Sequence, residues 1–185
     1  MHKIAALLFL LSALDCTLVF AQSSRDHLGR VPMKDELRKW DSPVLPDGTG
    51  LPNGSGSAVH GELLFAHKCA GCHGTRGEGR DPVGPQLAGG IGTLGTSNPV
   101  LTVGSYWPFS TSVWDYIHRA MPYYPQPGTL SVDDTYSVTA YIFYLNRIIR
   151  KDEVMNQQTL PRVQMPNRNG FVSDPRPDVH TTAKR

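Results

Sequence analysis

Five consecutive residues carry the most specific chemistry in the sequence. Cys69-Ala70-Gly71-Cys72-His73 has two thiols three positions apart, followed directly by an imidazole. This C-x-x-C-H spacing is the attachment signature of haem c, because each thiol can form a thioether with one vinyl group of the porphyrin while the histidine faces the iron. A redox dithiol and half of a zinc site are the alternatives, but the sequence has no second cysteine pair to complete a zinc site. We therefore predict one haem c, attached covalently through Cys69 and Cys72, with His73 as an iron ligand.

The second iron ligand must come from another part of the chain. The methionines beyond the N-terminal apolar segment are Met33, Met121, Met155 and Met165. We favour Met121, because it follows a long glycine-rich loop, precedes a proline and comes before the last long helix. Met165 also precedes a proline and is the second candidate, and an ordinary packed methionine is the remaining alternative. A His/Met pair leaves no open position on the iron, which disfavours catalysis there and suits an electron carrier.

The pair Gly84-Pro85 is a candidate partner of His73. A proline can pack against the imidazole while its carbonyl oxygen accepts a hydrogen bond from the ring N–H, and such a bond fixes the tautomer of a metal-binding histidine. We therefore predict that Pro85 contacts the haem and orients His73.

Three further side chains are predicted to contact the haem: Arg80, Tyr106 and Trp107. Arg80, or Arg76 in its place, can pair with a haem propionate, although loop arginines are as often solvated. Tyr106 and Trp107 can pack at the haem edge and donate a hydrogen bond to a propionate, with simple core packing as the equal alternative.

Helices must position these residues. Apolar spacing predicts four of them, over 34–40, 59–72, 112–120 and 131–150. Residues 74–105 are rich in glycine and are predicted to be irregular loop. No convincing sheet is visible, so the expected architecture is all-α.

Periodicity also predicts which helix faces are buried. In the helix over 59–72 the predicted packing face consists of Val59, Leu63, Ala66 and Ala70; in the last helix it consists of Val132, Tyr136, Ala140 and Phe143. Two capping boxes are predicted at helix starts: Ser112 with Asp115, and Ser131 with Asp134.

The chain divides into four predicted segments: a signal peptide over 1–21, an N-terminal extension over 22–57, a core domain over 58–150 and a C-terminal extension over 151–185. The signal has a basic start, an apolar run over 4–14 and a small-residue cleavage site before Gln22. It implies export to the periplasm. The apolar run is short for a membrane span, so no stable span is expected after cleavage, with an uncleaved anchor as the alternative. The extensions are expected to lie on the surface, because they are polar and rich in proline and glycine.

Composition excludes several classes of protein. With 185 residues, 39% hydrophobic and 18% charged, the chain suits a single modest core and is too apolar for a disordered protein. A net charge of +2 without a basic cluster gives no reason to expect nucleic-acid binding. The third cysteine, Cys16, lies in the predicted signal peptide, so the mature chain keeps only the two cysteines of the haem motif.

Residues 58–149 resemble a class I cytochrome c domain. The resemblance rests on Gly61-x-x-x-Phe65-x-x-x-Cys69-Ala-Gly-Cys-His-Gly74, Gly84-Pro85-x-Leu87, Ala120-Met121-Pro122 and the aromatic helix around Tyr141-Ile-Phe-Tyr-Leu145. It implies an all-α class I fold of three to five helices around one haem, with the last helix packed across the first and with long irregular extensions at both ends.

A narrower resemblance covers about residues 28–178. Strings such as Pro46-Asp-Gly-Thr-Gly-Leu-Pro52, Gly104-Ser-Tyr-Trp-Pro-Phe109 and Met165-Pro-Asn-Arg168 look like the cytochrome subunit of sulfur (sulfite) dehydrogenase in the Sox pathway. The resemblance implies a molybdopterin-containing dehydrogenase subunit as electron donor and another cytochrome or an oxidase as acceptor. It implies the monohaem form, because the chain has a single C-x-x-C-H motif. On this reading the chain is a non-catalytic electron-transfer subunit; a free carrier that donates to a terminal oxidase and a haem enzyme are the alternatives.

Overall fold

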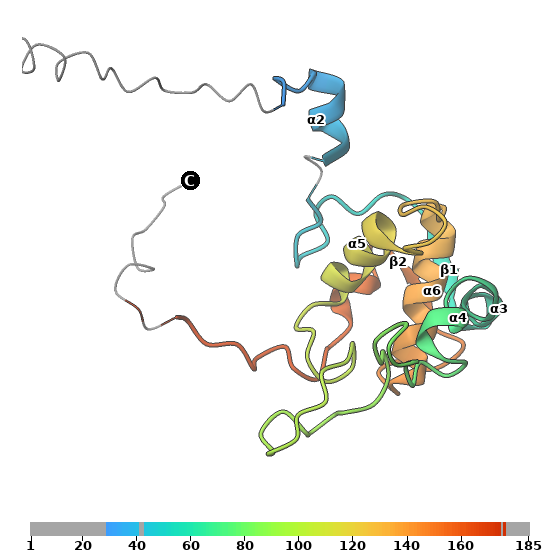
Figure 1. Ribbon diagram of the computed structural model, residues 1–185, viewed down its shortest axis with the longest axis vertical. Coiled ribbons are helices and arrows are strands. Elements are labelled where there is room, and N and C mark those ends of the chain that lie inside the picture. Colours follow the sequence, from blue (N-terminus) through green and yellow to red (C-terminus); the bar gives the residue numbers. More distant parts are fainter. Residues whose placement is uncertain (1–28, 41–42, 175, 177–185) are drawn as a thin grey trace, which may run out of the picture. The chain divides into compact units, whose positions relative to one another are not determined.

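The structure is a computed structural model that describes residues 29–40, 43–174 and 176 (Figure 1). The chain divides into two compact units, Met1–Trp40 and Asp41–Arg185. The predicted signal peptide and its cleavage site before Gln22 lie outside the described residues. In the first unit, helix α2 (Lys34–Trp40) confirms the short helix expected there. No helix in the described part of the chain is both long and apolar enough to cross a membrane.

The helix expected over 59–72 is divided into two in the structure. Helix α3 (Ala58–Lys68) begins at Ser57, whose hydroxyl accepts from the backbone N–H of His60, and helix α4 (Ala70–His73) follows it. The break lies at Cys69, whose φ of −120° and ψ of −39° depart from helical values. The Cys69 thiol and the His73 imidazole therefore lie at the two ends of a single short turn.

The buried face of α3 differs from the predicted one. Ala58, Gly61 and Phe65 are buried, whereas Val59 is 56% exposed and Leu63 is 64% exposed. The prediction followed the larger apolar side chains and was wrong, because the face that packs is the one where a small residue allows the closest approach.

That approach joins α3 to helix α6 (Val132–Leu145) at Gly61. A Cβ atom on Gly61 would collide with the backbone carbonyl of Ser137 and contact the Tyr141 side chain. One turn later, the ring of Phe65 packs on Tyr141 with 5.3 Å between ring centroids. The two helices thus meet backbone to backbone, as expected when the last helix of this fold packs across the first.

Helix α6 is the centre of the second unit, with α3 and α5 packed against it (Figure 1). Every residue from Thr135 to Phe143 is buried, which is more than the single apolar stripe expected from the sequence. The hydroxyls of Thr135, Ser137 and Thr139 each donate to the backbone carbonyl four residues earlier. These bonds let polar residues lie inside the core without unpaired groups. At the start of α6, Ser131 caps the N–H of Asp134 as predicted.

Helix α5 (Ser110–Ala120) begins two residues before the predicted start. Its N-cap residue is Phe109, without a side-chain cap, so the predicted capping box of Ser112 with Asp115 is wrong. Asp115 instead pairs with Arg119 one turn later, at 2.7 Å. The helix ends at Met121 in extended conformation.

A short sheet contradicts the expectation that none would form. Strand β1 (Ser55–Ser57) pairs antiparallel with strand β2 (Val154–Asn156), with Gly56 opposite Met155. A Cβ on Gly56 would collide with the backbone of Ser137, so β1 lies directly against α6. Three-residue strands of this composition carry no periodic signal, which is why the sequence did not reveal them.

The segment that follows α6 belongs to the core rather than to a surface extension. It contains strand β2 and a 3₁₀ turn η1 (Leu160–Arg162) and is otherwise irregular. Within residues 151–165 four side chains are buried: Met155, Leu160, Val163 and Met165. Leu160 is fully buried and its carbonyl accepts from the hydroxyl of Ser110 on α5. The expectation of a surface extension is therefore wrong for residues 151–165.

We predict that Gly61→Ala destabilises the protein by about 2 kcal/mol, because the added methyl group meets a backbone carbonyl that cannot move without displacing α6. Helix propensity alone would favour alanine by about 1 kcal/mol, so the sign of the change is diagnostic. Urea unfolding of the haem-loaded protein measures it. Gly95→Ala is the control and should be nearly neutral, since nothing lies within 4 Å of its added Cβ. A stabilised Gly61→Ala protein would contradict the close contact.

Candidate haem site

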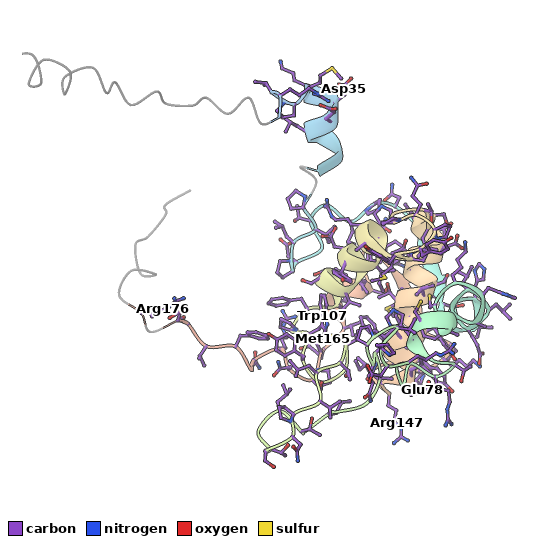
Figure 2. The ribbon with its side chains drawn as sticks, viewed as in Figure 1. Asp35, Glu78, Trp107, Arg147, Met165 and Arg176 are labelled. Atoms are coloured by element: carbon purple, nitrogen blue, oxygen red, sulfur yellow. The ribbon has the colours of Figure 1, made fainter. Side chains whose placement is uncertain are left out.

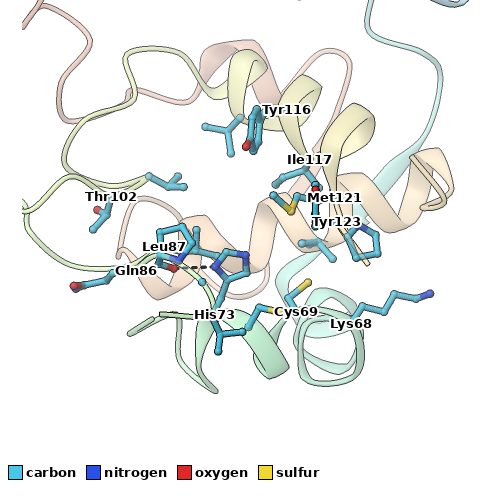
Figure 3. Close-up of a pocket in the computed structure, with 18 of the residues that line it drawn as sticks. Lys68, Cys69, His73, Gln86, Leu87, Thr102, Tyr116, Ile117, Met121 and Tyr123 are labelled. Atoms are coloured by element: carbon cyan, nitrogen blue, oxygen red, sulfur yellow. Dashed lines mark hydrogen bonds between the residues drawn. The ribbon is translucent and has the colours of Figure 1, made fainter. Parts of the chain in front are cut away.

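A cavity of about 420 Å³ lies between the α4 segment and the C-terminal half of α5 (Figure 3). Its walls are mainly apolar and include Leu87, Val103, Val113, Ile117 and Val138. This volume is in the range of cavities that hold a large organic ligand. The cavity therefore provides apolar walls large enough for a substantial part of a planar cofactor.

All three functional residues of the C-x-x-C-H motif line this cavity. Cys69 is half-buried, Cys72 is exposed and His73 is buried. The α4 turn holds them together, since the N–H of Cys72 and that of His73 both donate to the carbonyl of Cys69, at 3.0 and 2.9 Å. Two thiols at the rim and an imidazole within the cavity are the arrangement that haem attachment requires.

The alternatives to haem fit this geometry less well. A redox dithiol needs a nucleophilic thiol of lowered pKa, whereas burial raises the pKa of the Cys69 thiol to about 11. A zinc site needs further ligands, and no cluster of three or more His, Cys, Asp or Glu side chains suited to a metal occurs within the described residues.

His73 is oriented by the segment that the sequence pointed to. Its ring Nδ1–H donates to the carbonyl oxygen of Pro85 at 2.8 Å, which leaves Nε2 as the nitrogen available to a metal. Gly84 makes this contact possible, because a Cβ there would lie 2.5 Å from the carbonyl oxygen of Cys72. Glycine before proline thus lets the two chain segments touch.

Met121 lies on the other side of the cavity from His73 (Figure 3). It is the C-cap residue of α5, and its N–H donates to the carbonyl of Ile117 at 3.0 Å. Met165, the second candidate, does not line the cavity; it is 3% exposed and belongs to the core (Figure 2). The structure therefore brings together His73 and Met121, and leaves Met165 apart.

Of the other three predicted haem contacts, Trp107 lines the cavity, whereas Arg80 and Tyr106 do not. Trp107 lines the cavity and packs edge-on against Tyr116, with 5.6 Å between ring centroids. Arg80 does not line it; its guanidinium donates to the carbonyl of Gly71 at 2.9 Å, behind the α4 turn. Tyr106 does not line it either and packs on Phe171, with 5.3 Å between ring centroids.

Several lining residues were not identified from the sequence. Tyr116, Tyr123 and Tyr124 border the cavity, and Tyr123 and Tyr124 are 80% and 83% exposed. Their position immediately after Met121-Pro122 is a signal that sequence reasoning could have used, because residues beside a ligand share its wall. They surround the mouth of the cavity with aromatic rings rather than with charges.

The residues present fit a haem c on four independent points: thiols at the rim, an imidazole whose Nε2 is available, a thioether on the other wall, and apolar sides.

Comparison with known proteins gives the same family. The family model described as cytochrome c matches residues 58–146. A chain in the crystal structure of the sulfane dehydrogenase SoxCD from Paracoccus pantotrophus is 46% identical, with a TM-score of 0.72, over 83% of this chain and 75% of that chain. No curated protein sequence gives a significant match. The relative is 46% identical over three quarters of its length, and the haem motif of this chain lines a cavity. The chain therefore belongs to the class I c-type cytochromes and is an electron-transfer cytochrome.

Proposed function

We propose that the chain is the haem subunit of a periplasmic dehydrogenase that oxidises a sulfur compound. In this role it holds one haem c through Cys69 and Cys72. It takes electrons from a molybdopterin subunit and passes them to another cytochrome or to an oxidase. The observation that carries the proposal is the extent of the similarity: 46% identity over 83% of the chain reaches well beyond residues 58–146. A shared haem core alone would not extend into the flanking segments.

When bound, a haem c supplies an iron that gains and loses single electrons. The residues of the chain decide what else can happen at the site. His73 and Met121 line the same cavity and would hold the iron between them, which would leave no place on it for a substrate. Leu87, Val103 and Val138 give the cavity apolar walls, which would surround a bound haem with hydrocarbon rather than with polar groups. This arrangement supports an electron-transfer subunit rather than a haem enzyme.

The mouth of the cavity supports a docking role. Cys72, Tyr123 and Tyr124 are exposed there, and they are joined by the apolar side chains of Val83 and Leu101, which are 60% and 56% exposed. Lys68 is the charged residue among those that line the cavity. A rim of this kind favours contact through apolar and aromatic groups, with a weak dependence on salt.

The first test concerns the partner. Purification of the chain from the periplasm under mild conditions should recover a second subunit together with molybdenum, measured by elemental analysis. Recovery of the chain alone, combined with rapid electron transfer to a terminal oxidase, would favour the free carrier instead.

The second test maps the docking surface. Replacing both Tyr123 and Tyr124 with Ser should raise the dissociation constant for the dehydrogenase subunit about ten-fold or more, because exposed aromatic residues dominate binding energy. The matched control replaces Val59 and Leu63 with Ser, since these are also exposed but lie on α3 away from the cavity lining. Equal losses in both proteins, or none in either, would contradict docking at the cavity mouth.

The third test concerns the iron ligand. Met121→Ala should remove the weak thioether-to-iron absorption at the red end of the ferric spectrum and lower the reduction potential. Met165→Ala should keep that absorption while losing about 2–5 kcal/mol of stability, because it leaves a cavity in the core. The opposite pattern of absorption would assign the ligand to Met165.

The fourth test removes the cofactor. Replacing Cys69 and Cys72 with Ala should give a chain without a cooperative unfolding transition, because the cavity lies among the buried side chains of the core and would be left unfilled. Circular dichroism during heating measures this. A compact, cooperatively melting, haem-free protein would show that the polypeptide core suffices.

A further inference from the structure

The segment Leu87–Gly89 is held by a buried amide from the end of α6. Asn146 is 3% exposed, and its Nδ2 donates to the carbonyls of Leu87 and Ile142, at 3.1 and 2.9 Å. Its Oδ1 accepts from the backbone N–H of Gly89 at 2.9 Å. Both carbonyls can only accept and the N–H can only donate, so this is the one orientation of the amide that satisfies all three partners.

A second chain segment also holds Leu87 and Gly89. The hydroxyl of Thr102 donates to the carbonyl of Gly89 at 2.6 Å, and the N–H of Val103 donates to the carbonyl of Leu87 at 3.2 Å. Gly104 then lies directly against Asn146, since a Cβ on Gly104 would collide with Oδ1 of the amide. Asn146 therefore connects α6 to both loop segments that form walls of the cavity.

The segment Leu87–Gly89 leads directly to the partner of His73. Pro85 is two residues before Leu87, and the N–H groups of Leu87 and Ala88 both donate to the carbonyl of Gly77, at 2.8 and 3.0 Å. Pro85 lines the cavity, and Gly84 before it is held by two backbone hydrogen bonds that it exchanges with Arg80, both at 2.9 Å. The Pro85 carbonyl therefore lies between two fixed points of the chain, Gly84 before it and Leu87–Gly89 after it.

We propose that Asn146 is a positioning residue for the iron ligand His73. It fixes Leu87–Gly89, thereby holds the Pro85 carbonyl 2.8 Å from His73 Nδ1, and so sets how strongly the imidazole donates to iron. This inference rests on the proposed haem site. It adds a residue 73 positions from His73 in the sequence and outside the lining of the cavity.

The physical link is the hydrogen bond on the far nitrogen of the ring. An imidazole whose Nδ1–H is well bonded is a more basic ligand and stabilises the oxidised metal. When that bond is looser, the oxidised form loses stabilisation and the reduction potential rises. The Nδ1 proton is then also exposed more often to exchange with solvent.

The test compares Asn146→Ala with the unmodified haem-loaded protein. In the reduced, diamagnetic form, NMR should show that the His73 Nδ1 proton exchanges with solvent about ten-fold faster or more. The substitution removes the hydrogen bonds of Asn146 to Leu87 and Gly89, which are of ordinary strength. The reduction potential should rise in the same protein. Gly104→Ala should shift both quantities in the same direction, because the added methyl displaces the amide without removing it.

Tyr136→Phe is the matched control. Tyr136 is also buried on α6, and its hydroxyl donates to a backbone carbonyl, that of Pro52, at 3.0 Å. It should lower stability without changing either the proton exchange or the potential. If Asn146→Ala and Gly104→Ala lower stability like Tyr136→Phe and leave proton exchange and potential unchanged, Asn146 is only a structural residue and the proposal is wrong.

The two variants keep the proposal testable even if one of them fails to fold, since the other then decides by the same two measurements; loss of folding in both would overturn it in favour of a purely structural role. Failure of the underlying haem site is distinguished because it shows in the unmodified protein, as a missing haem spectrum or as a His73 ring that is not bound to iron.

Discussion

The close contact between Gly61 of α3 and Ser137 of α6 is the constraint on which the remaining arrangement depends. It holds the two helices so close together at this point that any side chain larger than that of glycine would collide with the backbone of α6. Because α3 leads through Cys69 into the α4 turn, the contact also determines where His73 lies relative to α6. The other end of α6 carries Asn146, which holds the loop that contacts His73. One helix thus serves as the reference for both sides of the histidine.

Helix α6 is buried on all sides from Thr135 to Phe143, and it can be packed closely there only because several of its residues are small. Large apolar residues on every face would leave no room for α3 and β1 to approach. Ser137 and Thr139 are small enough for close packing, and their hydroxyls bond to carbonyls of the same helix. Burial without unpaired polar groups therefore comes from local bonds within the helix rather than from partners elsewhere.

The sequence was most informative where chemistry requires particular residues at fixed spacing. The C-x-x-C-H motif, the contact between His73 and Pro85 and the cap at Ser131 depend on local rules, and the structure has all three in place. The helices at 34–40 and 110–120 also lie close to their predicted ranges, and α6 begins where expected but ends at Leu145 rather than at Arg150.

The errors arose where contacts distant in sequence decide the outcome. The buried face of α3 follows Gly61 rather than Leu63, because the partner on α6 sets the distance of approach. Strands β1 and β2 are too short to have a pattern of their own. Met155 and Leu160 looked like parts of a polar tail, yet they fill space beside α5 and α6 that only the folded chain defines. The partner that Arg80 has in the structure, the backbone carbonyl of Gly71, could not be predicted from spacing either.

The pairing of β1 with β2 also has a consequence for the entropy of the chain. With Gly56 opposite Met155, the two strands close a ring of backbone that contains every residue lining the cavity. Closing so long a ring is costly, because the entropic penalty grows with the logarithm of its length. A cofactor tied to both His73 and Met121 would divide this ring into shorter loops. In those terms a bound cofactor would act as an internal crosslink that lowers the entropic cost of pairing β1 with β2.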